Sequence, residues 1–340
     1  MTEKQGKVTI YDVAALAGVS VSSVSRVLHG VPNVRSDVRE RVEKAVAELE
    51  YVPNRTAQML KTHRSYMLVH VVADVTLPYY ITLHRKLRAV AEARGYQIIL
   101  FDADKDGRRV QRYVQQNAAS LDGIICSARA VHEKLLEVFY ESGLPVVFTH
   151  DCSQQVFDAC YLAPGAGTKL CMEHFLSLGH RRIAYVGSDA EDAINLGRLN
   201  TYRAMLKENG IAAEEELIHL VDEQMNGGYR AGRYLAQLEE PPTAVYASGD
   251  MIAVGVIQAM HDFSLDVPGK VSVTGENDML FGRSLSPALT TVSDPAEMIG
   301  SQAMEYLLDR VEGRYTGPAR VVEMDDRALI VRGSTGKAKA

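Results

Sequence analysis

The chain has no tryptophan, only four cysteines and no long apolar run. Because Cys126, Cys152, Cys160 and Cys171 are scattered and form no Cys-X-X-Cys pair, they argue against a disulfide framework or a zinc site and suit a reducing compartment. No stretch approaches the roughly 20 apolar residues of a membrane span. The polar residues 1–7 are not followed by the apolar segment of a signal peptide. We therefore expect a cytoplasmic protein without membrane contact.

Common catalytic and nucleotide-binding motifs are also missing. The pair Gly165 and Gly167 lacks the third glycine of a dinucleotide-binding turn. No P-loop, His-Glu-X-X-His or Gly-X-Ser-X-Gly pattern occurs in the sequence. We expect no enzyme activity, no catalytic residues, no cofactor and no bound metal.

Length and charge separate a small head from a larger body. A length of 340 residues indicates two or three domains. Residues 1–64 contain ten Lys and Arg against seven Asp and Glu, whereas the remainder contains 27 basic and 36 acidic residues. A basic head on an acidic body favours a head that meets phosphate groups and a body that does not.

Three short helices are expected in the head, over residues 10–16, 21–28 and 36–49. Thr9, Ser20 and Ser36 are suited to cap them, and Gly18 breaks the chain between the first two. One shared core would be formed by Ile10, Val13, Ala14, Ala17, Val19, Val24, Val27, Leu28, Val38, Val42, Ala45, Val46 and Leu49. A helix, a short glycine turn and a second helix predict a helix-turn-helix.

The second helix exposes small hydroxyl side chains and one arginine, at Ser22, Ser23, Ser25 and Arg26. Small side chains allow a helix to approach the floor of the major groove, and an arginine can bind guanine O6 and N7 with both arms. The alternative is a small helical bundle without a DNA-binding role, whose solvated face would normally carry more Lys and Glu. These residue types favour DNA binding.

The runs 8–28 and 42–60 closely resemble the DNA-binding headpiece of the LacI/GalR family of transcriptional regulators. The resemblance implies a sequence-specific repressor that binds pseudo-palindromic, double-stranded operator DNA as a homodimer. It implies that the bases are read by Val21, Ser22 and Arg26. It implies that the DNA backbone is contacted by Tyr11, Ser20, Ser25, Asn33, Asn54 and Arg55. Leu60 resembles the side chain that wedges into the minor groove and bends the duplex.

A hinge helix and linker are expected over residues 53–65, after a headpiece that spans residues 1–52. Pro53 marks the start of the hinge, and the family resemblance makes residues 54–60 a short helix. A helix of about seven residues is too short to be stable alone in water. We therefore expect the hinge to order only against its dimer mate and DNA.

From residue 66 the sequence alternates short apolar runs with amphipathic stretches. The runs cover residues 67–73, 97–101, 123–127, 145–149, 182–187, 244–248 and 271–275. This pattern predicts an α/β fold with parallel sheets, in which ligands bind at the carboxyl ends of the strands. The fold class we expect is a small all-α helix-turn-helix headpiece followed by this α/β core.

The body also resembles the LacI/GalR core, which is built like a periplasmic sugar-binding protein of two lobes. The matching runs are 77–80, 179–184, 241–244, 250–255 and 289–292. The resemblance implies a first lobe of residues 66–163 and 294–325 and a second lobe of residues 164–293 and 326–340. Three chain crossings would lie near residues 163, 293 and 325, with a small-molecule effector, a sugar or related metabolite, bound between the lobes.

Carried over by position, the resemblance implies an effector site lined by Asp74, Tyr79, Tyr80, Ser127, His150, Leu162, Arg198, Glu223, Gly249, Asn277 and Asp294. A guanidinium group such as that of Arg198 can clamp two hydroxyls or a carboxylate. The alternative for Arg198 is a surface salt bridge. The flat faces of Tyr79 and Tyr80 suit a sugar or a base, and the alternative for either is a place in the core of the lobe.

The sequence departs from the family pattern at three of these positions. Gly275-Glu276-Asn277 stands where relatives usually have glycine, an aromatic residue and aspartate. Gly249 replaces a side chain that is often polar, and His150 replaces a carboxylate or arginine. The site therefore differs chemically from those of the best-known members. Whether the effector is an inducer or a corepressor depends on which state of the repressor it binds better.

Three functions other than an effector-controlled regulator are alternatives for this sequence. The co-regulator could be a phosphoprotein docking on the body, because residues 8–11 and 32–34 resemble the branch of the family that governs carbon catabolism. A ligand-binding protein with a vestigial head would be favoured by loss of Arg26, Pro53 or Leu60, and all three are present. An enzyme on the two-lobed fold would need a nucleophile and a base in the cleft, and the sequence offers none.

Overall fold

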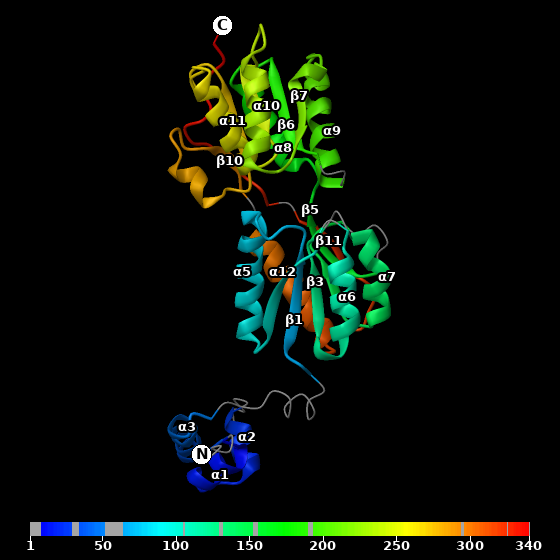
Figure 1. Cartoon of the computed structure of the whole chain (residues 1–340), viewed down its shortest axis with the longest axis vertical. Helices are drawn as coiled ribbons and strands as arrows, with labels where there is room; N and C mark the ends of the chain where they lie inside the picture. Colours follow the sequence, from blue (N-terminus) through cyan, green and yellow to red (C-terminus); the bar gives the residue numbers. More distant parts are fainter. Residues whose placement is uncertain are drawn as a thin grey trace, which may run out of the picture. The chain divides into compact units, whose positions relative to one another are not determined.

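The computed structural model divides the chain into two compact units, Met1–Ser65 and Tyr66–Ala340. It describes residues 8–28, 34–51, 64–104, 106–128, 132–151, 156–189, 193–293, 296–324 and 326–339. The described elements of the first unit are all helices, and the second unit contains two six-stranded sheets with helices on both faces (Figure 1).

Three helices make up the described part of the head: α1 (Ile10–Ala17), α2 (Val21–Leu28) and α3 (Ser36–Glu48). Their shared core buries Val13, Ala14, Ala17, Val24, Val27, Val42, Ala45 and Tyr51. The bounds of α2 are those predicted, whereas α1 ends one residue later than expected. Ser36 is the first residue of α3 rather than its cap, because Arg35 occupies the cap position.

Local hydrogen bonds and one glycine define the ends of α1 and the start of α2. The carboxylate of Asp12 accepts hydrogen bonds from the amide and hydroxyl of Thr9 at 2.8 and 2.7 Å, at the end of α1 where the helix dipole favours an anion. Gly18 ends α1 with φ of 62°, a left-handed conformation that glycine adopts without steric cost. The hydroxyl of Ser20 accepts a hydrogen bond from the amide of Ser23 at 3.2 Å, as predicted for the cap of α2.

The first sheet of the body has the strand order β11-β5-β4-β3-β1-β2, and all its pairs are parallel. Its strands are β1 (Met67–Val72), β2 (Gln97–Asp102), β3 (Gly123–Cys126), β4 (Val146–Phe148), β5 (Asp158–Leu162) and β11 (Val321–Met324). The connecting segments contain α5 (Pro78–Ala93), α6 (Arg108–Asn117), the 3-10 turn η1 (Ala118–Ser120) and α7 (His132–Ser142), and α12 (Ala296–Val311) precedes β11.

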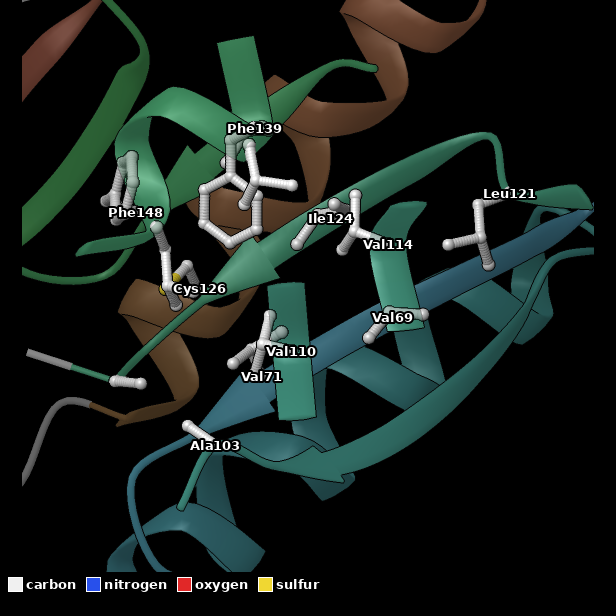
Figure 2. Packing of buried hydrophobic residues seen from close by; sticks show 14 of the residues in the cluster. Val69, Val71, Ala103, Val110, Val114, Leu121, Ile124, Cys126, Phe139 and Phe148 are labelled. Carbon is white, nitrogen blue, oxygen red and sulfur yellow. The ribbon is translucent and has the colours of Figure 1, made fainter. Parts of the chain in front are cut away.

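Alternate residues of these strands pack into two separate cores, as the pleat of a sheet requires. One face packs on α6 and α7, where Val69 and Ile124 meet Val110, Val114 and Phe139 (Figure 2). The other face buries Leu68, Ile125, Val147 and Cys160 against α5 and α12. Because both faces are covered, the strands read as continuous apolar runs, which is why the sequence indicated a parallel sheet.

The second sheet has the order β12-β10-β9-β8-β6-β7, and only the β10–β12 pair is antiparallel. Its strands are β6 (Ile183–Ser188), β7 (Ile218–Val221), β8 (Ala244–Ala247), β9 (Ser272–Glu276), β10 (Thr290–Val292) and β12 (Leu329–Ile330). Its other elements are α8 (Ala166–Ser177), α9 (Ala193–Glu208), η3 (Glu215–Leu217), α10 (Met225–Ala236), α11 (Asp250–Asp262) and η4 (Leu280–Ser284). Buried side chains of α8 and α9 pack on one face and those of α10 and α11 on the other.

The chain passes between the two sheets three times, after β5, after β10 and after β11 (Figure 1). We call the parts built on the first and second sheets the first and second lobes. Within the described ranges, no single helix has the length and apolar composition of a membrane span. Among these described helices, only α1 and α2 taken together have the required length and apolar composition, and the chain bends by 103° between them.

Candidate functional site

The outer surface of α2 carries polar side chains, while its inner surface belongs to the core of the head. Val24 and Val27 are buried, whereas Ser22 and Arg26 are exposed. Val21 is half-buried at the edge of the core. Among the residues that the structure describes, no carboxylate forms an ion pair with Arg26, so its guanidinium group is available to a partner outside the chain.

The angle between α1 and α2 is fixed by the turn that joins them. The bend of 103° lies within the range of about 90–120° found in helix-turn-helix motifs. Nη1 of Arg41, on α3, donates a hydrogen bond of 3.3 Å to the carbonyl oxygen of Ala17, the last residue of α1. Tyr11 of α1 is 71% exposed. The head therefore presents α2 and part of α1 on a rigid three-helix frame.

A cleft opens where the carboxyl ends of strands from both lobes approach each other. Ligands of α/β folds with parallel sheets bind at such strand ends. The cleft is lined by Leu77, Pro78, Tyr79, Tyr80, Thr149, Leu162, Ile194, Arg198, Glu223, Gly249, Asp250, Met251, Asn277, Met279 and Arg327. It therefore combines apolar and aromatic surface with a few charged groups.

Arg198 is the most deeply buried cation of the cleft, with 8% of its surface exposed. Its Nη2 donates to Oε2 of Glu276 at 2.6 Å, and its Nη1 donates to Oδ1 of Asn195 at 3.2 Å. Burial is the largest single effect and would lower the pKa of Arg198, but the charges of Glu276 and Glu223 and the hydrogen bond to Glu276 act together with the other nearby groups to raise it. Arg198 is therefore charged at every physiological pH.

Glu276 is the last residue of β9 and is 3% exposed. The hydroxyl of Tyr246, on β8, donates to its Oε1 at 2.6 Å. The hydroxyls of Tyr246 and Thr168 lie 2.9 Å apart, which links the carboxylate to α8. Burial raises the pKa of Tyr246, so this phenol stays protonated and able to donate. Arg198, Glu276, Tyr246 and Thr168 form one buried polar network, which we call the Arg198 network.

Asp250 begins α11 and is also buried at the cleft. Its Oδ1 accepts a hydrogen bond from the hydroxyl of Thr291 and its Oδ2 one from the amide of Met279, each at 2.6 Å. Burial raises the pKa of Asp250 to about 7 despite these bonds. The charge of the cleft therefore changes within the physiological range of pH.

Comparison with known proteins assigns both units. Residues 9–54 match bacterial regulatory proteins of the lacI family, and residues 172–335 match the periplasmic binding protein-like domain. The repressor PurR of Erwinia tasmaniensis, an HTH-type transcriptional repressor, is 30% identical over 318 residues, which cover 90% of this chain and 91% of PurR. The chain belongs to the LacI family. It is a DNA-binding transcriptional regulator, as the sequence predicted.

Two solved structures of LacI-type regulators share the fold over nearly the whole chain. The complex of the transcriptional regulator CelR with cellobiose is 28% identical, with a TM-score of 0.72 over 96% of this chain and 99% of CelR. The Lac repressor dimer bound to operator and the anti-inducer ONPF is 25% identical, with a TM-score of 0.82 over 97% of this chain and 99% of that chain. These likenesses confirm the predicted helix-turn-helix head and two-lobed α/β core.

Seven side chains that the LacI resemblance assigned to an effector site lie together at the cleft: Tyr79, Tyr80, Leu162, Arg198, Glu223, Gly249 and Asn277. The rings of Tyr79 and Tyr80 meet edge to face with centroids 5.2 Å apart. Tyr80 is buried and Tyr79 half-buried. Tyr79 packs against the first-lobe core and both residues line the cleft, so a place in the core and a place at the cleft are not exclusive.

Three other predicted residues are not among those that line the cleft. Asp74 accepts hydrogen bonds from the amide and hydroxyl of Thr76, both at 2.7 Å. The hydroxyl of Ser127 accepts from that of Thr149 at 2.7 Å and lies 2.8 Å from Nε2 of His70. Ser127 therefore reaches the cleft only through Thr149.

His150, the third of these residues, is buried beside the first-lobe core, with its ring edge to face on Phe148 at 5.1 Å. Several predicted positions lie outside the described residues: Asp294 of the cleft, and Asn33, Asn54, Arg55 and Leu60 of the DNA-binding part.

The sequence reading left out several cleft residues, of which Glu276 and Asp250 carry the most chemistry. Both stand at the carboxyl end of a buried strand or directly after one, where ligand-binding groups of parallel sheets gather. Glu276 was noticed only as a departure from the family pattern. A charged residue at the end of a predicted strand was the signal that could have identified it.

Proposed function

We propose that this chain is a homodimeric repressor of the cytoplasm that binds pseudo-palindromic operator DNA and is controlled by a small polyhydroxylated effector. One observation carries the proposal: a helix-turn-helix unit with an exposed arginine on its second helix and a separate unit with a cleft at its strand ends occur in the same chain. Two related structures point the same way, one a complex with cellobiose and the other a dimer on operator DNA. The proposal assigns the chain no catalytic step.

On the DNA side, Val21, Ser22 and Arg26 would read base edges in the major groove. Ser22 and Arg26 are exposed on one side of α2, with small residues between them, which supports close approach to the groove floor. Tyr11, Ser20 and Ser25 lie on or beside the same two helices and would contact phosphates, together with Asn33, Asn54 and Arg55. Dimer symmetry would match the two half-sites of the operator.

On the effector side, the cleft would enclose a molecule with several hydroxyl groups. Hydroxyls both donate and accept, so they can pair with the carboxylates of the cleft and with the remaining N–H groups of Arg198. Tyr79 and Tyr80 line the cleft and offer aromatic surface for the carbon face of a sugar ring. Apolar walls with a few convergent polar groups are typical of such sites.

Coupling between the two functions would depend on the angle between the lobes. An effector that contacts both lobes binds one lobe arrangement better than another, and only this difference in affinity can shift the repressor between states. The change would pass to DNA through residues 53–65 and the wedge at Leu60. An effector that favours paired hinges acts as a corepressor, and one that favours separated hinges acts as an inducer.

The full chain can be tested by thermal denaturation with a panel of sugars, nucleosides and sugar phosphates. Binding to the folded state raises the melting temperature. The matched variant is Gly249→Leu, because a Cβ at Gly249 would meet only Oε1 of Glu223 at 3.5 Å and Nδ2 of Asn277 at 3.9 Å, both ordinary contacts. The longer side chain would fill the cleft without strain on the backbone, which is extended there with φ of −165°.

We expect at least one compound to stabilise the wild type, to lose this effect in Gly249→Leu, and to change the affinity for operator DNA. A compound that stabilises both proteins equally binds elsewhere. If no stabilising compound changes operator affinity, the proposed control by an effector is wrong.

A further inference from the structure

The buried guanidinium group of the cleft is already paired with a carboxylate of its own chain. Nη2 of Arg198 and Oε2 of Glu276 lie 2.6 Å apart, and both side chains are at most 10% exposed. An unpaired arginine at this place would attract a carboxylate or phosphate group of a ligand, because the planar guanidinium binds such groups with paired hydrogen bonds. Here Glu276 holds the position that the acidic group of a ligand would take.

Glu276 is itself held in place by two further elements, β8 and α8. Tyr246 of β8 donates to its second oxygen at 2.6 Å, and Tyr246 is bonded in turn to Thr168 of α8. The carboxylate packs on the first turn of α8, where a Cβ on Gly167 would come within 2.6 Å of Oε1. Glycine at 167 leaves the space that the carboxylate fills, and the N-terminal end of a helix favours a negative charge. The pairing is therefore a built feature of the second lobe.

The rest of the cleft adds negative rather than positive charge near Arg198. The charge of Glu223 also acts on Arg198, so two carboxylates act on one guanidinium group. Asp250 lines the same cleft and adds a further negative charge only above its raised pKa of about 7. The other cation of the described lining is Arg327, which donates to the carbonyl oxygen of Ala163 where the chain crosses between lobes.

We propose that Glu276 is a specificity-determining residue that makes the cleft select an uncharged polyhydroxyl ligand and reject phosphorylated or acidic ones. The inference rests on the proposed function, because it names the class of effector for the same cleft. An anion at Arg198 would have to displace Glu276 or lie beside two carboxylates, and repulsion between like charges excludes it. A hydroxyl group meets no such penalty, because Arg198 has more N–H donors than the two hydrogen bonds described.

The test uses the full chain and isothermal titration with inorganic phosphate, glucose and glucose 6-phosphate. Glu276→Gln keeps the shape of the side chain and an oxygen that can accept a hydrogen bond from Tyr246. It removes the negative charge that pairs with Arg198. Glu223→Gln is the matched control, because it removes an equal charge from the same cleft and leaves the Arg198–Glu276 pair intact. Circular dichroism and binding to operator DNA check that each variant is folded.

We expect the wild type and Glu223→Gln to show no measurable binding of either phosphate compound, and Glu276→Gln to bind phosphate at least about tenfold more tightly than the weakest affinity that the titration detects. The gain should disappear when Arg198→Ala is added to Glu276→Gln. Equal gains in the two single variants would mean that net charge alone decides, which overturns the proposal. No gain in folded Glu276→Gln would also overturn it.

If Glu276→Gln does not fold, the wild type decides. If the wild type binds glucose 6-phosphate and Arg198→Ala does not, the inference is wrong. If the wild type binds an uncharged sugar but not glucose 6-phosphate, the inference is supported. The proposed function is judged separately. A phosphorylated compound that binds through Arg198 and changes operator affinity contradicts only this inference, whereas a panel in which no compound changes operator affinity contradicts the proposed function.

Discussion

Arg198 and Glu276 lie 78 positions apart in the sequence, yet their side chains meet at 2.6 Å in the wall of the cleft. One comes from α9 and the other from the end of β9. Neither charge could be buried alone, because an unpaired ion in a protein interior costs several kcal/mol. The pair therefore connects the stability of the second lobe to the chemistry of its ligand site.

Replacing Arg198 with alanine should destabilise the body by about 3–5 kcal/mol, because Glu276 would be left buried without its counter-ion. Urea denaturation followed by circular dichroism measures this loss. The control is Arg203→Ala, which removes a solvent-exposed partner of Glu215 at 3.0 Å and should cost less than about 1 kcal/mol. Equal losses in the two variants would contradict a structural role for the buried pair.

Asp250 should make the stability of the body depend on pH. Its pKa is raised from 3.8 to about 7 in the folded chain, so the folded state holds a proton that the unfolded state releases. The stabilisation from this proton is fully present below pH 3.8 and is lost as the pH rises through about 7. Relative to Asp250→Asn, the wild type should lose free energy of unfolding over this interval. Parallel pH profiles for the two proteins would contradict the assignment.

Leu60→Ala tests the part of the mechanism that follows from the family resemblance. If Leu60 enters the minor groove, its loss should weaken operator binding and reduce the bend of the DNA, while the melting of the body stays unchanged. Gel mobility of circularly permuted operator fragments measures the bend. An unchanged bend angle would refute the wedge.

The sequence predicted most of the head because its signals are local. The break at Gly18, the cap at Ser20 and the apolar spacing of α2 all act within a few residues, and α2 begins and ends as expected. Arg35 was the exception: it takes the cap position of α3 although Ser36 is the better capping residue type.

In the body, the long apolar strands were predicted and several short ones were not. β7 is a partly exposed edge strand, and β10 consists of Thr290, Thr291 and Val292, which are too few and too polar to stand out. The Arg198–Glu276 pair was hidden for a different reason. A single sequence gives no distance between residues on separate elements, so Arg198 was expected to face the ligand alone or to form a surface salt bridge, and the buried pair was not foreseen.

The central claim is that α2 reads operator DNA, and Arg26 tests it most directly. Sequences enriched from a random duplex library by the wild-type chain should form a pseudo-palindrome. With Arg26→Ala the preference should be lost at one symmetry-related pair of positions, at a cost of about 1–3 kcal/mol against the wild-type site. The control is Arg35→Ala, which removes an exposed arginine at the cap position of α3 that is paired with Asp37, and it should leave the preferred sequence unchanged. An identical preferred sequence for wild type and Arg26→Ala would contradict the account.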